Sequence, residues 1–137
     1  MTDFQLDPRL AADTILLADL PLSRLLMMRD GNYPWLILVP RRAGAVEILD
    51  LAAEDRAALW SEIERVAEAL RAETAADKLN VAALGNVVAQ LHVHVIARFR
   101  ADAAWPAPVW GRVPAIPLDE ARAAALAAGV KARLGLA

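Results

Sequence analysis

The segment that decides the fold is VVAQLHVHVIARF, residues 87–99, which contains both histidines of the 137-residue chain. Apolar residues alternate with Gln90, His92 and His94, and a period of two is typical of a β-strand. We therefore expect a strand over residues 90–99. One side of this strand would present the carboxamide and the two imidazoles, and its other side would be apolar and face a core.

The sequence on either side predicts further strands. Runs of aliphatic residues bounded by Pro, Gly or Asn indicate strands, and the DGN turn at residues 30–32 joins two of them into a hairpin. These expected strands cover residues 14–20, 23–29, 33–41 and 79–84. Asp7-Pro8 suits a short helical turn before the first strand.

A long amphipathic helix is expected over residues 51–73. Leu59, Ile63, Val66 and Leu70 recur at helical spacing, with Glu and Arg between them. Apolar strands around one long helix favour the α+β class with an antiparallel sheet.

Two aspartates are candidate helix caps. Asp50 precedes the long helix, and Asp119 precedes an Ala-rich helix that we expect to extend to about residue 134. Between the last strand and this helix, the Pro- and Trp-rich residues 105–117 should be extended and irregular. The length fits a single domain over residues 1–137.

Composition excludes several functions. The net charge is −2 and the basic residues are scattered, so no electrostatic case exists for nucleic-acid binding. The chain has no cysteine, which rules out disulfides and thiolate chemistry and suits the cytoplasm. No apolar run reaches the roughly 20 residues that cross a bilayer, so no membrane partner is expected.

The spacing of the two histidines alone allows three interpretations of their role. It can be an exposed polar strand face or a pair of hydrogen-bonded interface residues. It can be part of a metal site, but no Asp or Glu lies between Asp77 and Asp102 to supply a third ligand nearby. It can also act on phosphorus, because a neutral imidazole is a nucleophile that forms a phosphoramidate with an electrophilic phosphate.

The segment resembles the signature of the histidine triad (HIT) family, which is His-φ-His-φ-His-φ-φ with φ apolar. Here residues 90–96 read QLHVHVI, so every apolar position and two of the three histidines match. Arg98 fits the family's frequent arginine after the motif, and GNVV at residues 85–88 resembles its phosphate-contacting loop. YPWLILVPR and WPAPVWG resemble a bacterial subgroup that has Gln in place of the first histidine. The resemblance implies a HIT-like antiparallel sheet.

The resemblance also implies roles for individual residues. His92 matches the middle histidine, the nucleophile that becomes nucleotidylated, and His94 matches the third histidine, which supports the site and contacts phosphate. Gln90 stands in place of the first histidine, where its carboxamide can donate a hydrogen bond to phosphate but cannot titrate near pH 7. Gly85 and Asn86 match the polar loop that reaches phosphate, although Asn86 can equally be a turn residue.

Three departures from the family pattern concern the substrate. Trp35 and Leu36 follow Pro34 where many members have Gly-His, so a supporting histidine is absent. Met28 falls near the position that often binds the ribose hydroxyls. These changes leave the phosphate end of a nucleotide better supported than its sugar end.

Two tryptophans after the motif, Trp105 and Trp110, have alternative roles. They can cover the pocket or pack against a partner subunit, or they can form a local Trp–Pro cluster that seals the chain's own core.

Three hypotheses for function follow. The first is a HIT-like nucleotide phosphohydrolase or nucleotidyltransferase with a covalent nucleotidyl-His92 intermediate, which needs no metal or cofactor. It implies a small-molecule nucleotide substrate and a homodimer whose sheet continues across the interface. The second is a catalytically weak dimeric module that binds a nucleotide or phosphate. The third is a metal-dependent hydrolase.

Overall fold

Five strands form one antiparallel sheet in the order β1-β2-β3-β5-β4, in a computed structural model that describes residues 3–136. With three α-helices, this confirms the expected α+β class. The strands are shorter than the sequence predicts at one or both ends: β1 (Thr14–Asp19), β2 (Ser23–Met28), β3 (Trp35–Pro40), β4 (Lys78–Ala82) and β5 (Val93–Arg98).

The turn between β2 and β3 confirms the hairpin predicted at residues 30–32. Asp30 is buried there, and its carboxylate accepts hydrogen bonds from both the backbone and the side-chain nitrogen of Asn32. This local bonding is the reason that Asp and Asn favour turns. The turn places β2 and β3 side by side at the centre of the sheet.

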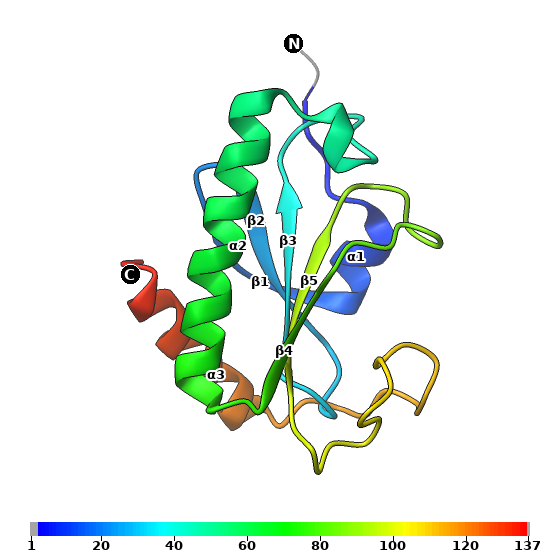
Figure 1. Ribbon diagram of the computed structural model, residues 1–137, viewed down its shortest axis with the longest axis vertical. Helices are drawn as coiled ribbons and strands as arrows, with labels where there is room; N and C mark the ends of the chain where they lie inside the picture. The colour runs from blue at the N-terminus through cyan, green and yellow to red at the C-terminus, as the bar shows by residue number, and fades with distance from the viewer. Residues whose placement is uncertain (1–2, 137) are drawn as a thin grey trace.

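Helix α2 (Ala53–Thr74) lies along one face of the sheet (Figure 1). Its predicted apolar residues Leu59, Ile63, Val66 and Leu70 are at most 4% exposed. They belong to one core cluster with alternate residues of β3 and β5, namely Leu36, Leu38, Val93 and Val95. Burial of each such side chain contributes about 1.5–3 kcal/mol, so this face carries the main core. Helix α3 (Glu120–Arg133) packs beside α2 and β1.

The two predicted helix caps have different outcomes. Asp119 is the N-cap of α3, and its carboxylate accepts from the Arg122 backbone N–H. The prediction for Asp50 is wrong, because α2 starts at Ala53 after the N-cap Ala52. Asp50 instead ends a short 3₁₀ turn, η1 (Ile48–Asp50), where its carboxylate accepts two backbone N–H groups from residues 46 and 47.

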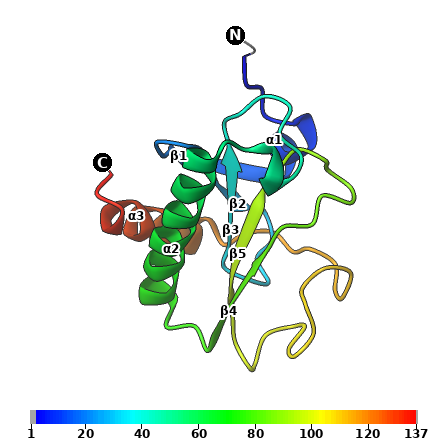
Figure 2. The same cartoon turned by 45° about the horizontal axis from the view of Figure 1, so that its top comes forward.

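The opposite face of the sheet is covered by segments without a long helix. Helix α1 (Pro8–Asp13) and residues 3–7 before it lie on this side, away from α2 (Figures 1 and 2). They form a second apolar cluster with Trp35, Ile37 and Ile96 of the sheet and Val109 of the loop after β5. Both histidines lie on this thinner side.

Candidate active site

Strand β5 positions His94 near the middle of the sheet. In the strand register, His94 pairs with Ile37 of β3 on one side and Ala82 of β4 on the other. His92 lies two residues earlier, just before the strand begins. The two imidazole rings meet edge to face with their centroids 4.9 Å apart. The polar face that the sequence predicts is therefore present, but β5 begins at Val93 and not at Gln90.

The His92 ring is oriented by the chain next to it. Its Nδ1 lies 2.7 Å from the carbonyl oxygen of Gln90. A carbonyl only accepts hydrogen bonds, so the Nδ1 atom carries the proton in this contact. The other nitrogen of a neutral ring, Nε2, then holds a lone pair. His92 is therefore oriented as a nucleophile or general base through Nε2.

The His94 ring has the opposite tautomer. The indole Nε1–H of Trp35 donates to His94 Nδ1 over 2.9 Å. An indole nitrogen is only a donor, so Nδ1 accepts and the ring proton lies on Nε2. Burial, together with the smaller effect of the neighbouring His92, lowers the pKa of His94 to about 3. His94 is therefore a neutral Nε2–H donor at physiological pH.

The two Nε2 atoms are the available polar atoms of the pair. Neither makes a hydrogen bond within residues 3–136. In that range, the side-chain polar atoms that are fully enclosed and lack a partner are Ser23 Oγ, Tyr33 Oη and Arg56 Nε. Neither histidine Nε2 is among them, so both Nε2 atoms keep some contact with solvent. The site thus combines a lone pair on His92 with a hydrogen-bond donor on His94. This combination suits an electrophilic centre that carries anionic oxygens.

Aromatic side chains surround His94. The Trp110 ring lies 5.0 Å from the His94 ring and meets it edge to face. Trp110 also meets Trp35 at 5.7 Å, and Trp35 meets Tyr33 at 6.2 Å. Trp110 therefore lies beside His94 and packs against the apolar cluster of its own chain. These rings exclude water from one side of the pair.

Gln90 has partners that the sequence did not suggest. Its Nε2 donates to the carbonyl oxygen of Gln5, and its Oε1 accepts from the backbone N–H of Asp7, both over 2.8 Å. The carboxamide was expected to face phosphate beside His92. In the structure it instead holds the N-terminal chain, residues 5–7, against the sheet. Gln90 shapes the border of the site by this contact.

The loop at Gly85 and Asn86 connects β4 to the motif. Gly85 has a φ of +82°, in the region that favours glycine. Asn86 is exposed, and its side chain makes no hydrogen bond to any of residues 3–136. Val88 packs against the same cluster as Trp110. The structure therefore joins this loop to the histidine side of the sheet through Val88, and does not join Asn86 to the histidines.

Arg98 at the end of β5 anchors the loop that carries Trp110. It is 1% exposed and forms a two-pronged ion pair with Asp102, at 2.8 and 3.0 Å. It also donates to Asn80 and to the Ala107 carbonyl oxygen, and it lies 5.7 Å from the Trp105 ring. Burial by itself raises the pKa of Asp102, but Arg98 and three backbone N–H donors hold it well below its usual value.

Metal and membrane sites are not found in the described chain. Among residues 3–136, no three His, Cys, Asp or Glu side chains gather as metal ligands would. No helix in the same range is both long and apolar enough to cross a bilayer.

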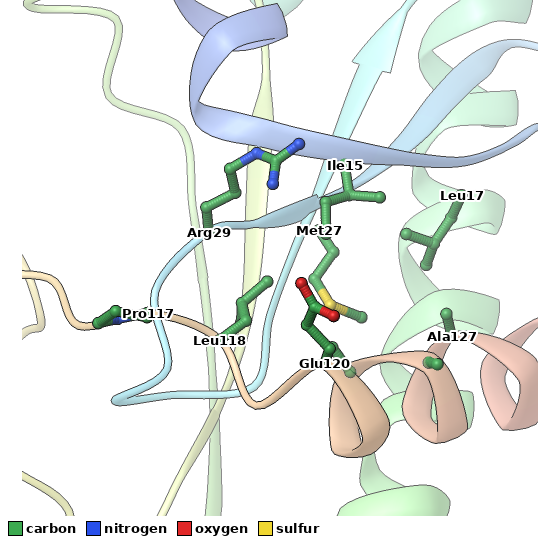
Figure 3. A pocket seen from close by; sticks show the side chains of 10 residues that line it. Ile15, Leu17, Met27, Arg29, Pro117, Leu118, Glu120 and Ala127 are labelled. Atoms are coloured by element: carbon green, nitrogen blue, oxygen red, sulfur yellow. The ribbon is translucent and has the colours of Figure 1, made fainter.

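A groove of about 470 Å³ lies between β1, β2 and the start of α3 (Figure 3). It is lined by Leu17 and Met27, which belong to the α2 face of the sheet. The groove is therefore separate from the histidines.

Comparisons with known proteins define the family. The HIT domain model matches residues 9–101. A crystal structure of a histidine triad protein from Bradyrhizobium japonicum is 50% identical, with a TM-score of 0.95 over 96% of this chain and 98% of that one. Histidine triad proteins from Sinorhizobium meliloti and Marinobacter aquaeolei are 45% and 44% identical, with TM-scores of 0.92 and 0.93. These two cover 95% and 98% of this chain, and 96% and 98% of their own. No curated protein matches significantly.

The matched model spans more than half of the chain, and the chain belongs to the HIT family. The resemblance seen in residues 85–98 is thereby confirmed at the level of the family. Sequence reasoning missed the role of Trp35, whose indole meets His94. A signal was present, since Trp35 and Leu36 follow Pro34 where many family members have Gly-His, but residue type alone did not reveal a partner on β5.

Proposed function

We propose that this protein is a nucleotide phosphohydrolase or nucleotidyltransferase that acts through a covalent nucleotidyl-His92 intermediate. Members of the HIT family are generally nucleotide-binding hydrolases or transferases, which supports the class of reaction. The observation that carries the proposal is the orientation of His92. Its Nδ1–H is held by the Gln90 carbonyl, so the Nε2 lone pair is available for attack.

The proposed reaction has two displacements at phosphorus. In the first, the His92 Nε2 lone pair forms a bond to the α-phosphorus, while the bond from phosphorus to the leaving group breaks. The leaving group keeps that electron pair and takes a proton from solvent. In the second, the oxygen of water or another acceptor bonds to the same phosphorus while the bond from phosphorus to His92 Nε2 breaks. Nε2 keeps that electron pair, which returns His92 to its neutral form, and the attacking group releases its proton to solvent. The expected leaving groups are an amine, a phosphate or a nucleotide.

The neighbours of His92 would lower the barriers of both steps. Attack through Nε2 makes the ring cationic, and the Gln90 carbonyl oxygen stabilises the Nδ1–H of that cation. His94 would donate its Nε2–H to a phosphate oxygen. We retain Gly85 and Asn86 as a proposed phosphate-contacting loop, and the exposed Asn86 amide is free to meet a ligand. For Gln90, the side chain would contribute indirectly, by holding residues 5–7.

A kinetic comparison tests this proposal. Nucleoside phosphoramidates and dinucleoside polyphosphates are assayed with the wild-type protein and with His92→Ala. Loss of the nucleophile should reduce turnover by at least about 1,000-fold. Equal turnover by the two proteins would contradict the proposal.

A dimeric binding module with weak chemistry is the second candidate. It is favoured by the partners of Gln90, which are backbone groups of the chain itself, and by the packing of Met28 in an apolar cluster. Calorimetry with nucleoside monophosphates separates the candidates, because binding without His92-dependent turnover supports the module. For the metal-dependent hydrolase, elemental analysis of the purified protein is the corresponding test.

We propose that residues 1–137 form one domain. We also propose that two copies form a homodimer whose sheet continues across the interface. Strand β4 is terminal in the sheet, and its Val81 is 44% exposed. An unpaired strand edge can pair with a second copy. Analytical ultracentrifugation of the wild type and Val81→Asp tests this, with a dimer expected only for the wild type.

We further propose a cytoplasmic location and membership of the bacterial subgroup with Gln in the first motif position.

A further inference from the structure

The Trp35 indole is buried and makes one hydrogen bond, to His94. Trp35 opens β3 and is 5% exposed. Its Nε1 lies 2.9 Å from His94 Nδ1, and the two ring centroids are 5.6 Å apart. The backbone pairing of β3 with β5 fixes the separation of the two side chains, since Leu36 pairs with Val95 and Ile37 with His94. The contact is therefore part of the sheet and not of a mobile loop.

This contact decides what His94 can offer to a ligand. A neutral imidazole can carry its proton on either nitrogen, and its ring can turn over within its site. A donor at Nδ1 selects the orientation and tautomer in which the N–H is on Nε2. Burial keeps His94 neutral, so the ring does not become an imidazolium with protons on both nitrogens. The hydrogen bond from Trp35 therefore determines which nitrogen carries the proton.

We propose that Trp35 is a positioning residue, whose indole N–H holds the His94 ring so that its Nε2–H points to the reacting phosphate beside His92. This inference rests on the proposed function for its consequence in catalysis. The effect on His94 itself is independent of any substrate. Trp35 contacts neither phosphate nor nucleophile in this account and acts only through His94.

Trp110 provides an internal comparison. Its ring centroid lies 5.0 Å from that of His94, against 5.6 Å for Trp35, but it makes no hydrogen bond to His94. Trp110→Phe thus removes an indole N–H from the same aromatic cluster and leaves the donor to Nδ1 in place. Trp60 on α2 is 51% exposed and far from this cluster in the fold, so Trp60→Phe is a remote control.

Nuclear magnetic resonance tests the positioning directly. The chain has only two histidines, so the imidazole nitrogen spectrum contains two sets of signals, and His92→Ala assigns them. In the wild type, His94 should have its proton on Nε2 and show ¹⁵N–¹⁵N coupling across the hydrogen bond to Trp35. Trp35→Phe should abolish the coupling and shift His94 Nδ1, whereas Trp110→Phe should preserve the coupling. A proton on His94 Nδ1 in the wild type, or an unchanged Nδ1 signal in Trp35→Phe, would overturn the inference.

A double-mutant cycle tests the consequence for catalysis. Trp35→Phe should lower kcat/KM about tenfold in the wild type but cause no further loss in the His94→Ala background, because Trp35 acts through His94. Trp60→Phe should leave activity unchanged, and Trp35→His, which restores a ring N–H, should recover part of the loss. Equal losses from Trp35→Phe in both backgrounds would indicate a merely structural role and overturn the inference.

The two arms also separate this inference from the proposed function. If the wild type shows no His92-dependent turnover, the proposed function fails, and the resonance experiment still decides whether Trp35 positions His94. If turnover depends on His92 but the His94 signals do not depend on Trp35, only the inference about Trp35 fails.

Discussion

Gln90 and Asp7 are 83 residues apart in the sequence, and the backbone N–H of Asp7 donates to Gln90 Oε1 over 2.8 Å. The same carboxamide donates to the Gln5 carbonyl oxygen. Phe4 and Leu6, on either side of Gln5, pack into the cluster that contains Trp35 and Trp110. Gln90 therefore links the N-terminal residues 5–7 to the histidine side of the sheet.

Gln90→Ala should release the N-terminal chain. Each lost hydrogen bond contributes about 0.5–1.5 kcal/mol, so we expect a loss of about 1–3 kcal/mol in the free energy of unfolding, with faster amide exchange over residues 5–7. Gln5→Ala is the matched control, because the backbone carbonyl that Gln90 contacts remains. Exchange rates that are the same in Gln90→Ala and Gln5→Ala would contradict this role.

His94 should make stability depend on pH. Its pKa falls from 6.5 in the unfolded chain to about 3 in the fold. Between these values the unfolded chain binds the additional proton, so the free energy of unfolding rises with pH. The stabilisation is complete above about pH 6.5 and is lost as the pH falls toward 3, with a slope of up to about 1.4 kcal/mol per pH unit.

Urea unfolding between pH 4.5 and 6 measures this slope. His94→Gln keeps an acceptor for the Trp35 indole but has no titrating group, so its slope should be smaller than that of the wild type. Parallel curves for the two proteins would show that His94 titrates normally in the fold.

Asp102→Asn should be strongly destabilising. It would leave the buried Arg98 guanidinium without its counter-charge, and loss of one member of a buried pair costs about 3–5 kcal/mol. Glu73→Gln, which removes the partly exposed partner of Arg133, should cost no more than about 1 kcal/mol. Chemical denaturation compares the two variants. Similar losses for both would mean that Arg98 finds another partner or reaches water.

Much of the fold follows from local patterns in the sequence. The helical spacing of Leu59, Ile63, Val66 and Leu70 predicts the buried face of α2, because one apolar stripe must pack on the sheet. The alternation around His92 and His94 likewise predicts their shared face. Such patterns depend on neighbours in the chain, so they can be read without knowledge of the tertiary structure.

The contacts that complete the candidate site depend on distant segments. Trp35 reaches His94 across 59 residues, and Gln90 reaches Asp7 across 83. Glu62 is a further example: its place on a polar-looking helix suggests exposure, but it is 4% exposed and accepts from the backbone N–H groups of Leu22 and Ser23. Residue type and spacing do not specify which strand lies opposite, so these partners could not be predicted.

Glu62→Ala should therefore destabilise the fold, because it leaves two buried backbone donors between β1 and β2 without an acceptor. We expect a loss of about 2–4 kcal/mol in the free energy of unfolding. Glu64→Ala, on the exposed side of the same helix, should change it by less than about 0.5 kcal/mol. Thermal unfolding of both variants checks the difference, and equal melting temperatures would contradict the role of Glu62.

The most direct test of the central claim is detection of the covalent intermediate. The wild-type protein is mixed with a nucleoside phosphoramidate or a dinucleoside polyphosphate, quenched rapidly and analysed by intact-protein and peptide mass spectrometry. We expect one nucleotidyl group per chain on His92 Nε2, and no adduct in His92→Ala. Turnover by the wild type with no adduct, or with an adduct on another residue, would contradict the account.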